Sequence, residues 1–89
     1  MVKNDQLQLT IMSPEEEMYS GEVQTVSAQN AKGRFDILPR HENFISIIYG
    51  QISFREMDGN LKSRLMDQAV IMVSQNQVQI FTGLRHQRR

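Results

Sequence analysis

The stretch GRFDILPRHENFISII, residues 33–48, decides the expected fold because it contains two apolar segments joined by a charged corner. Residues 35–38 lead into the corner, residues 39–43 form it, and residues 44–48 lead out of it. Pro39 has no N–H to donate and favours an extended conformation in the residue before it, so a sheet ladder must break here. The pattern predicts two strands joined by a polar surface loop, a kind of segment that often carries function. Arg40, His41 and Glu42 are the polar groups of that loop.

Strand patterns continue on both sides of this stretch. Residues 7–11 alternate strictly between apolar and polar side chains, which is typical of a half-buried strand. Residues 22–28 alternate imperfectly, which indicates a bulge or an off-register strand. Tyr49 and Gly50 are expected to turn the chain, and Asp58-Gly59 is a strong hairpin signal before the returning strand at residues 61–66.

Two short apolar runs, residues 44–48 and 69–73, are expected to be interior strands, the second one covered on both faces. A last hairpin at residues 74–76 leads to a strand at residues 77–82. Residues 13–16 resemble a helix start, but the room before the next extended segment allows a single turn at most. Because turn signals separate short strand patterns throughout, we predict an all-β two-sheet sandwich of about eight or nine short strands.

Composition limits the classes of function. The chain has 89 residues, no cysteine, and 10 basic against 10 acidic residues. Disulfides and thiolate chemistry are therefore excluded, and the zero net charge does not suggest a general nucleic-acid binder. We expect no direct membrane insertion, since no run approaches about 18 apolar residues. The basic residues of the tail, residues 83–89, are expected to be solvated rather than bound to an anionic partner.

The sequence lacks the residues of a recognisable enzyme, cofactor site or metal site. No phosphate-binding loop or dinucleotide fingerprint is present, and His41-Glu42 lacks the second histidine, since Ile occupies position 45. We therefore expect a non-catalytic protein with no cofactor and no metal, and interpret His41 as a turn histidine rather than a general base. Stacking of nucleic-acid bases is disfavoured because only Phe54 and Arg55 combine an aromatic with a basic residue.

Two features leave alternatives open. The acidic residues 15–17 could form a cation site, but unspaced carboxylates seldom converge on one ion, so a solvated face is favoured. The chain has 6 methionines, which could line an adaptable binding face or fill gaps in the core. We favour core filling for Met57, Met66 and Met72.

Several motifs, in this order and spacing, resemble the N-terminal β-domain of the epsilon subunit of F-type ATP synthases, which corresponds to delta in mitochondria. They are LQLTIMSPE at residues 7–15, MYSGEV at residues 18–23, GRFDILPRH at residues 33–41, and the hairpins at residues 58–59 and 73–78. The family usually writes the middle motif as Gly-x-Phe/Leu-Gly-Ile-Leu/Tyr-Pro-Gly-His. The similarity covers roughly residues 5–82 of this chain.

The resemblance implies a flattened antiparallel sandwich of ten strands, so the expected count is eight to ten, in one domain at residues 1–82 followed by the tail at residues 83–89. It also implies a non-catalytic subunit of the rotary central stalk, peripheral on the cytoplasmic face of the inner or plasma membrane, which supports the coupling of ion transport to ATP synthesis or hydrolysis. The gamma subunit and the membrane c-ring are the implied partners. The loops at residues 29–34 and 39–43 are the expected contacts, with Arg34, Asp36, Arg40, His41 and Glu42 as the contact residues.

This sequence departs from the family at informative positions. Asp36 and Arg40 replace the two motif glycines, and Arg34 occupies a position that is often acidic. Asp67-Gln68-Ala69 stands where the family commonly has Ser-Gly-Gly. The family's C-terminal helical pair has no counterpart before Arg89, so its inhibitory and ATP-binding activities are not inferred. These departures motivate a second hypothesis, in which a stand-alone β-sandwich adaptor has reused the scaffold.

Overall fold

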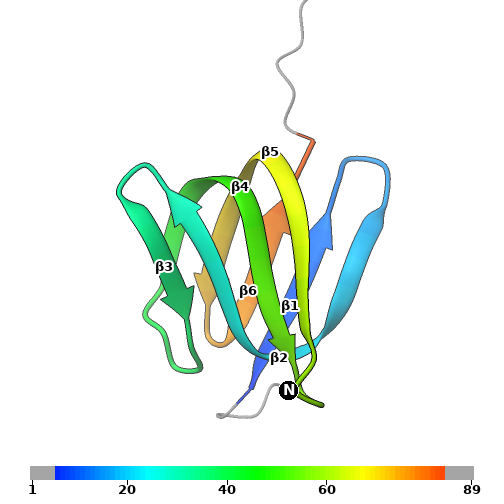
Figure 1. Cartoon of the computed structure of the whole chain (residues 1–89), viewed down its shortest axis with the longest axis vertical. Coiled ribbons are helices and arrows are strands. Elements are labelled where there is room, and N and C mark those ends of the chain that lie inside the picture. The colour runs from blue at the N-terminus through cyan, green and yellow to red at the C-terminus, as the bar shows by residue number, and fades with distance from the viewer. Residues whose placement is uncertain (1–5, 84–89) are drawn as a thin grey trace, which may run out of the picture.

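The computed structural model describes residues 6–83, and within them it contains six β-strands and no helix (Figure 1). The strands are β1 (Leu7–Met12), β2 (Glu17–Asn30), β3 (Gly33–Ile37), β4 (Phe44–Glu56), β5 (Leu61–Ser74) and β6 (Gln77–Phe81). The expectation of an all-β fold is therefore confirmed for the described residues.

The strands form one sheet that closes on itself. Its order is β1-β6-β5-β4-β2-β3, and an additional β1–β2 pairing joins the ends of a five-stranded ring, with β3 outside it on β2. Closure removes most unpaired strand edges, which otherwise invite association with other chains. The sheet is not antiparallel throughout, because β1 and β6 pair in parallel, with Leu9 opposite Val78.

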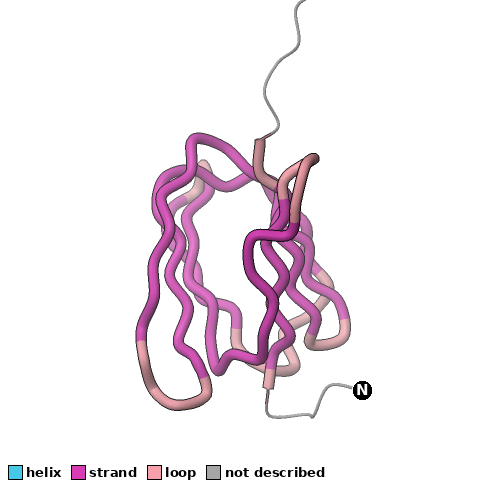
Figure 2. The backbone as a smooth tube through the Cα atoms, turned by 90° about the vertical axis from the view of Figure 1, so that its right-hand side faces the viewer, coloured by secondary structure: helices cyan, strands magenta, loops and turns pink. Residues whose placement is uncertain are grey.

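Sharp bends turn this ring into a flattened sandwich of two layers. The β4–β5 ladder shifts register between Tyr49 and Gly50, and β2 shifts between Val23 and Thr25 where it pairs with β4. Gly50 has a φ of 74°, a conformation that favours glycine. Each long strand therefore passes from one layer into the other, and Figure 2 shows the two layers joined where the chain bends.

The bends explain why the expected count of eight to ten strands is wrong. Bulges leave a strand continuous while changing its direction, so one bent strand has the sequence pattern of two short strands. Tyr49-Gly50 was expected to be a turn but lies inside β4, opposite a bulge in β5 at which Asp67 is the extra residue. The bulge expected within residues 22–28 is confirmed, as are the hairpins at Asp58-Gly59 and at residues 74–76.

The core lies between the layers and is formed by one side of each strand. Leu7, Leu9 and Ile11 of β1 are fully buried, as the alternation of residues 7–11 predicted. The expectation of interior strands at residues 44–48 and 69–73 is wrong, because Ile45 is 66% and Met72 is 38% exposed. Each of these mainly apolar runs thus has one side in the core and one side on the surface, a distinction that an apolar run cannot reveal.

Two smaller expectations have mixed outcomes. Residues 13–16 form a single turn in which the Ser13 hydroxyl accepts hydrogen bonds from the N–H groups of Glu15 and Glu16, so the absence of a helix is confirmed. Met66 packs against the core, as predicted, whereas Met57 and Met72 are exposed. Of the predicted tail, residues 84–89 lie outside the described part of the chain.

Candidate partner-contact site

The corner after β3 is a tight turn with an unusual residue at its third position. The His41 N–H donates to the Leu38 carbonyl at 3.1 Å, and Arg40 has a φ of 71°. Proline at the second position and a positive φ at the third define a type II turn, in which glycine is normally required at the third position. Arg40 therefore adopts the conformation for which the family's glycine is suited.

The turn is held from outside by Asn76, in the hairpin between β5 and β6. The Asn76 side-chain oxygen Oδ1 accepts a hydrogen bond from the Arg40 N–H at 2.6 Å, and the Asn76 carbonyl accepts one from the N–H of Gln8 at 2.8 Å. Asn76 is 8% exposed and is the buried polar residue of the described part of the chain. It thus connects β1, the last hairpin and the Pro39 turn.

His41 anchors the loop through its ring. Its Nδ1–H donates to the Glu42 carbonyl at 2.7 Å, and its ring packs edge-on against Phe44, with 5.7 Å between the ring centres. Phe35 of β3 contacts the same Phe44 ring at 5.2 Å. The His41 ring thus contacts a main-chain carbonyl and an aromatic ring, which supports its interpretation as a turn histidine.

The structure brings two of the five predicted contact residues together. Arg34 and His41 line one shallow hollow of about 220 Å³, with Lys32 at its rim and Phe35 and Phe44 in its wall. Its lining residues carry basic and aromatic side chains and no carboxylate. The hollow is therefore suited to an acidic group on a partner.

The other three predicted residues do not line this hollow. Asp36 is exposed on β3 and its carboxylate accepts a hydrogen bond from the Ser27 hydroxyl at 2.7 Å. Arg40 and Glu42 are exposed in the loop, beside His41. The predicted set is thus split between the surface of the β2–β3 pair and the turn.

Sequence reasoning missed a second surface, which we call the outer apolar face and define as Ile45, Ile47, Tyr49, Val70 and Met72. The sheet register pairs Ile45 with Met72 and Ile47 with Val70, so these side chains share the outward side of β4 and β5. Ile45 is 66% and Ile47 is 45% exposed. Such residues in contiguous pairs are characteristic of protein interaction sites.

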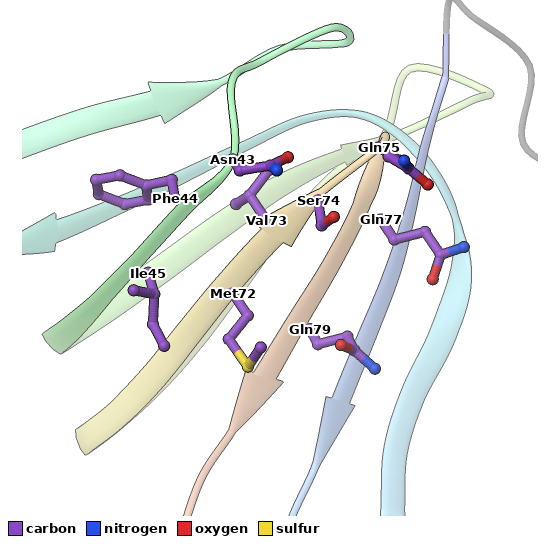
Figure 3. Close-up of a pocket in the computed structure, with 9 residues that line it drawn as sticks. All are labelled: Asn43, Phe44, Ile45, Met72, Val73, Ser74, Gln75, Gln77 and Gln79. Atoms are coloured by element: carbon purple, nitrogen blue, oxygen red, sulfur yellow. The ribbon is translucent and has the colours of Figure 1, made fainter.

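The outer apolar face continues into a groove next to the loop. The groove has a volume of about 610 Å³ and begins at Asn43, the last residue before β4. Figure 3 shows Ile45 and Met72 on neighbouring strands, with polar Gln77 and Gln79 beyond them on β6. The loop and the outer apolar face are therefore adjoining parts of one surface.

At the other end of β4, Tyr19, Glu56 and Lys62 form a structural cluster. The Tyr19 hydroxyl donates to Glu56 Oε2 at 2.9 Å, Lys62 Nζ lies 3.7 Å from Glu56 Oε1, and the Tyr19 ring packs on Phe54. Burial, followed by the hydrogen bond to Glu56, raises the pKa of Tyr19 to about 12.

Within residues 6–83 no group of three or more histidine and carboxylate side chains could hold a metal ion, and no helix is long and apolar enough to cross a membrane.

The comparison with known families decides the assignment of the fold. The family model of the ATP synthase delta/epsilon chain β-sandwich domain matches residues 6–83. The chain belongs to this family. The sequence resemblance noted above is thereby confirmed.

Curated relatives carry the same description. The chain is 32% identical to an ATP synthase epsilon chain of Nitratiruptor sp. over 74 residues, covering 82% of this chain and 57% of the relative. It is 31% identical to an ATP synthase epsilon chain of Clostridium botulinum over 77 residues, covering 85% of this chain and 58% of the relative. The chain thus spans somewhat more than half the length of these relatives.

Solved structures show the same fold. One is a chain of the Euglena gracilis mitochondrial ATP synthase, in a structure of OSCP, F1 and c-ring, with a TM-score of 0.82 at 18% identity, covering 88% of this chain and 51% of that one. The second is a chain of the central stalk and c-ring of the Tetrahymena thermophila mitochondrial ATP synthase, with a TM-score of 0.72 at 16% identity, covering 91% of this chain and 66% of that one.

Proposed function

We propose that this chain is a non-catalytic subunit of the central stalk of an F-type ATP synthase, where it links the gamma subunit to the membrane c-ring. Membership of the delta/epsilon family supports the assignment, and so does the resemblance of the fold to chains from central-stalk assemblies. In this role the domain joins two parts of the rotor and supports the coupling of ion transport to ATP synthesis or hydrolysis. It would lie peripherally, on the cytoplasmic face of the inner or plasma membrane.

The observation that carries the proposal is the outer apolar face beside a charged turn. A solvated Ile45–Met72 pair contributes little to the isolated domain, whereas its burial against a partner yields roughly 25 cal/mol for each Å² removed from water. We assign this face to the gamma subunit. A domain of 89 residues also has a small core, so docking on a larger partner adds to its stability.

The polar contacts are assigned to the neighbouring loops. The loop expected at residues 29–34 is a tight turn at residues 31–32 between β2 and β3, so Arg34 and Asp36 both lie on β3, while the loop at residues 39–43 carries Arg40, His41 and Glu42. Charged groups at the rim of an interface set the register and the choice of partner more than the affinity. We therefore assign these five residues to the contact with the c-ring and the adjoining part of gamma.

The experiment is the reconstitution of the rotor joint. The tagged chain is co-expressed with the gamma and c subunits from the same genome, and the captured complex is analysed by native mass spectrometry. We expect one copy of this chain for each gamma subunit. Failure of the folded chain to retain gamma under native conditions would contradict the proposal, and retention of an unrelated protein in its place would favour the stand-alone adaptor.

A further inference from the structure

The hydrogen bond between Asn76 and Arg40 connects segments that are 36 residues apart in the chain. The other hydrogen bonds of residues 38–42 that the structure describes lie within the loop, from the His41 N–H to Leu38 and from the His41 ring to Glu42. Among the described residues, Asn76 is thus the one whose hydrogen bond ties this loop to the rest of the domain. This hydrogen bond is partly buried, so leaving the Arg40 N–H or the Asn76 Oδ1 without a partner would cost folding free energy.

The local chemistry of the turn gives this hydrogen bond a specific role. Pro39 at the second position is compatible with both type I and type II turns, which differ by a flip of the peptide between residues 39 and 40. A type I turn places the third residue at negative φ, which suits arginine, whereas the observed φ of 71° at Arg40 suits glycine. The flip would turn the Arg40 N–H to the opposite side of the turn and away from Asn76.

Asn76 is itself suited to this position. It has a φ of 64°, and asparagine is among the side chains that tolerate the left-handed region best. Glycine would also permit this φ, but it has no side-chain acceptor. The residue therefore combines a permitted backbone conformation with an oxygen atom held in a buried place.

We propose that Asn76 is the positioning residue of the contact loop. By accepting a hydrogen bond from the Arg40 N–H, Asn76 selects the type II turn over the type I turn. It thereby fixes the positions of Arg40 and His41 relative to the hollow lined by Arg34, Lys32 and His41, which we call the basic hollow. The inference rests on the proposed function in one respect, namely that the loop at residues 39–43 contacts gamma and the c-ring. The choice of turn is a property of the isolated chain and is tested there first.

The first arm of the experiment measures the free chain. Asn76→Gly removes the acceptor and keeps the permitted φ, while Asn76→Asp keeps an acceptor. We expect hydrogen exchange of the Arg40 amide to become about tenfold faster in Asn76→Gly and to stay near the wild-type rate in Asn76→Asp. The NMR shifts of the His41 ring, which lies against Phe44, should move in Asn76→Gly alone.

The second arm tests rescue. In the double variant Arg40→Gly/Asn76→Gly, glycine at position 40 favours the type II turn without an acceptor, so the His41 ring shifts should return toward their wild-type values. The affinity for gamma and the c-ring should fall several-fold in Asn76→Gly and stay near the wild-type value in Asn76→Asp. The double variant is judged by the His41 ring shifts alone, because Arg40 belongs to the proposed contact. Arg40→Gly also relieves the backbone strain at φ 71°, so the urea midpoint of each variant is measured as well. The His41 ring shifts report the local turn, so their return in the double variant identifies positioning.

The outcomes are separable. Unchanged Arg40 exchange in Asn76→Gly, or equal loss in Asn76→Asp, overturns the proposal. Faster exchange with wild-type affinity overturns the link between loop position and contact. If the wild-type chain itself does not assemble with gamma, the proposed function fails, while the exchange rates and the His41 shifts still decide whether Asn76 positions the turn.

Discussion

Asp36 and Arg40 both replace glycines of the family motif, but the structure gives the two substitutions different physical meanings. Asp36 is a strand residue whose carboxylate accepts a hydrogen bond from Ser27 on the neighbouring strand. Arg40 keeps the left-handed φ, which costs a non-glycine residue roughly 1–2 kcal/mol. Position 36 therefore does not need glycine in this chain. At position 40 the hydrogen bond from the Arg40 N–H to Asn76 helps to hold arginine in a conformation that suits glycine.

Tyr19 gives a prediction about alkaline pH. Its pKa is raised from 10.0 to about 12 by burial and then by Glu56, so the folded protein keeps the phenol neutral where the unfolded chain ionises. The Tyr19 contribution to stability is therefore fully present below pH 10.0 and declines as the pH rises toward 12. Urea unfolding between these pH values should show this decline, and Tyr19→Phe should lack it.

The tyrosinate absorbance provides the control. The chain has 2 tyrosines, so a Tyr49→Phe background makes the ultraviolet titration specific to Tyr19. Glu56→Gln should lower the Tyr19 pKa only in part, because burial is its larger cause. A midpoint near 10 in the folded Tyr49→Phe protein would contradict the assigned environment.

At the scale of the elements, the bend of β4 depends on Gly50. A Cβ added at Gly50 would meet nothing within 4 Å, so the cost of Gly50→Ala comes from the φ of 74° alone. We expect this variant to lose about 1 kcal/mol of unfolding free energy, and Gly50→Asn to lose less, since asparagine tolerates this φ. The urea midpoint measures both.

The neighbouring Gln51 offers a matched control for Gly50. Gln51 is exposed in the same strand, and Gln51→Ala should change the stability by less than about 0.5 kcal/mol. Equal midpoints for Gly50→Ala and the wild type would show that the bend of β4 does not require glycine at this position.

Local patterns predicted the type of each element better than its extent. The alternation of residues 7–11 predicted β1 and its buried side, and Asp58-Gly59 predicted the β4–β5 hairpin. The number of strands could not be predicted, because a glycine at a bend within a strand, such as Gly50 opposite the β5 bulge, gives the same signal as a glycine in a hairpin turn. The parallel β1–β6 pair was also hidden, since pairing between distant segments has no local signature.

The candidate site was predictable only in part, for a related reason. The turn at residues 39–43 follows from Pro39 and its polar neighbours, but the approach of His41 to Arg34 depends on how the loop folds back along β3. The outer apolar face was missed because Ile45 and Met72 belong to short, mainly apolar runs that were assigned to the interior. An extended apolar run does not reveal whether its second side meets the core or a partner.

For the whole molecule, the outer apolar face gives a prediction about assembly. Ile47 is 45% exposed in the free chain, so Ile47→Lys should change stability by less than about 0.5 kcal/mol. At the centre of an apolar contact the same change should weaken gamma binding by about tenfold or more. Leu65→Lys is the matched control, since Leu65 is 85% exposed outside this face. Equal weakening by both variants would remove the special role of the face.

The charge of the basic hollow gives the last prediction, which concerns how the molecule finds its partner. Arg34 and Lys32 have no ion-pair partner among the described residues, and Arg34→Glu places a carboxylate where an acidic partner group is expected. Because rim charges act mainly through steering, we expect a slower association with the rotor partner and a weaker dependence on salt. Arg55→Glu makes the same charge change near the β4–β5 hairpin, where Arg55 donates to the Gly59 carbonyl, and should leave association unchanged. Stopped-flow association at low and high salt measures both variants, and equal rates for Arg34→Glu and the wild type would exclude Arg34 from the contact.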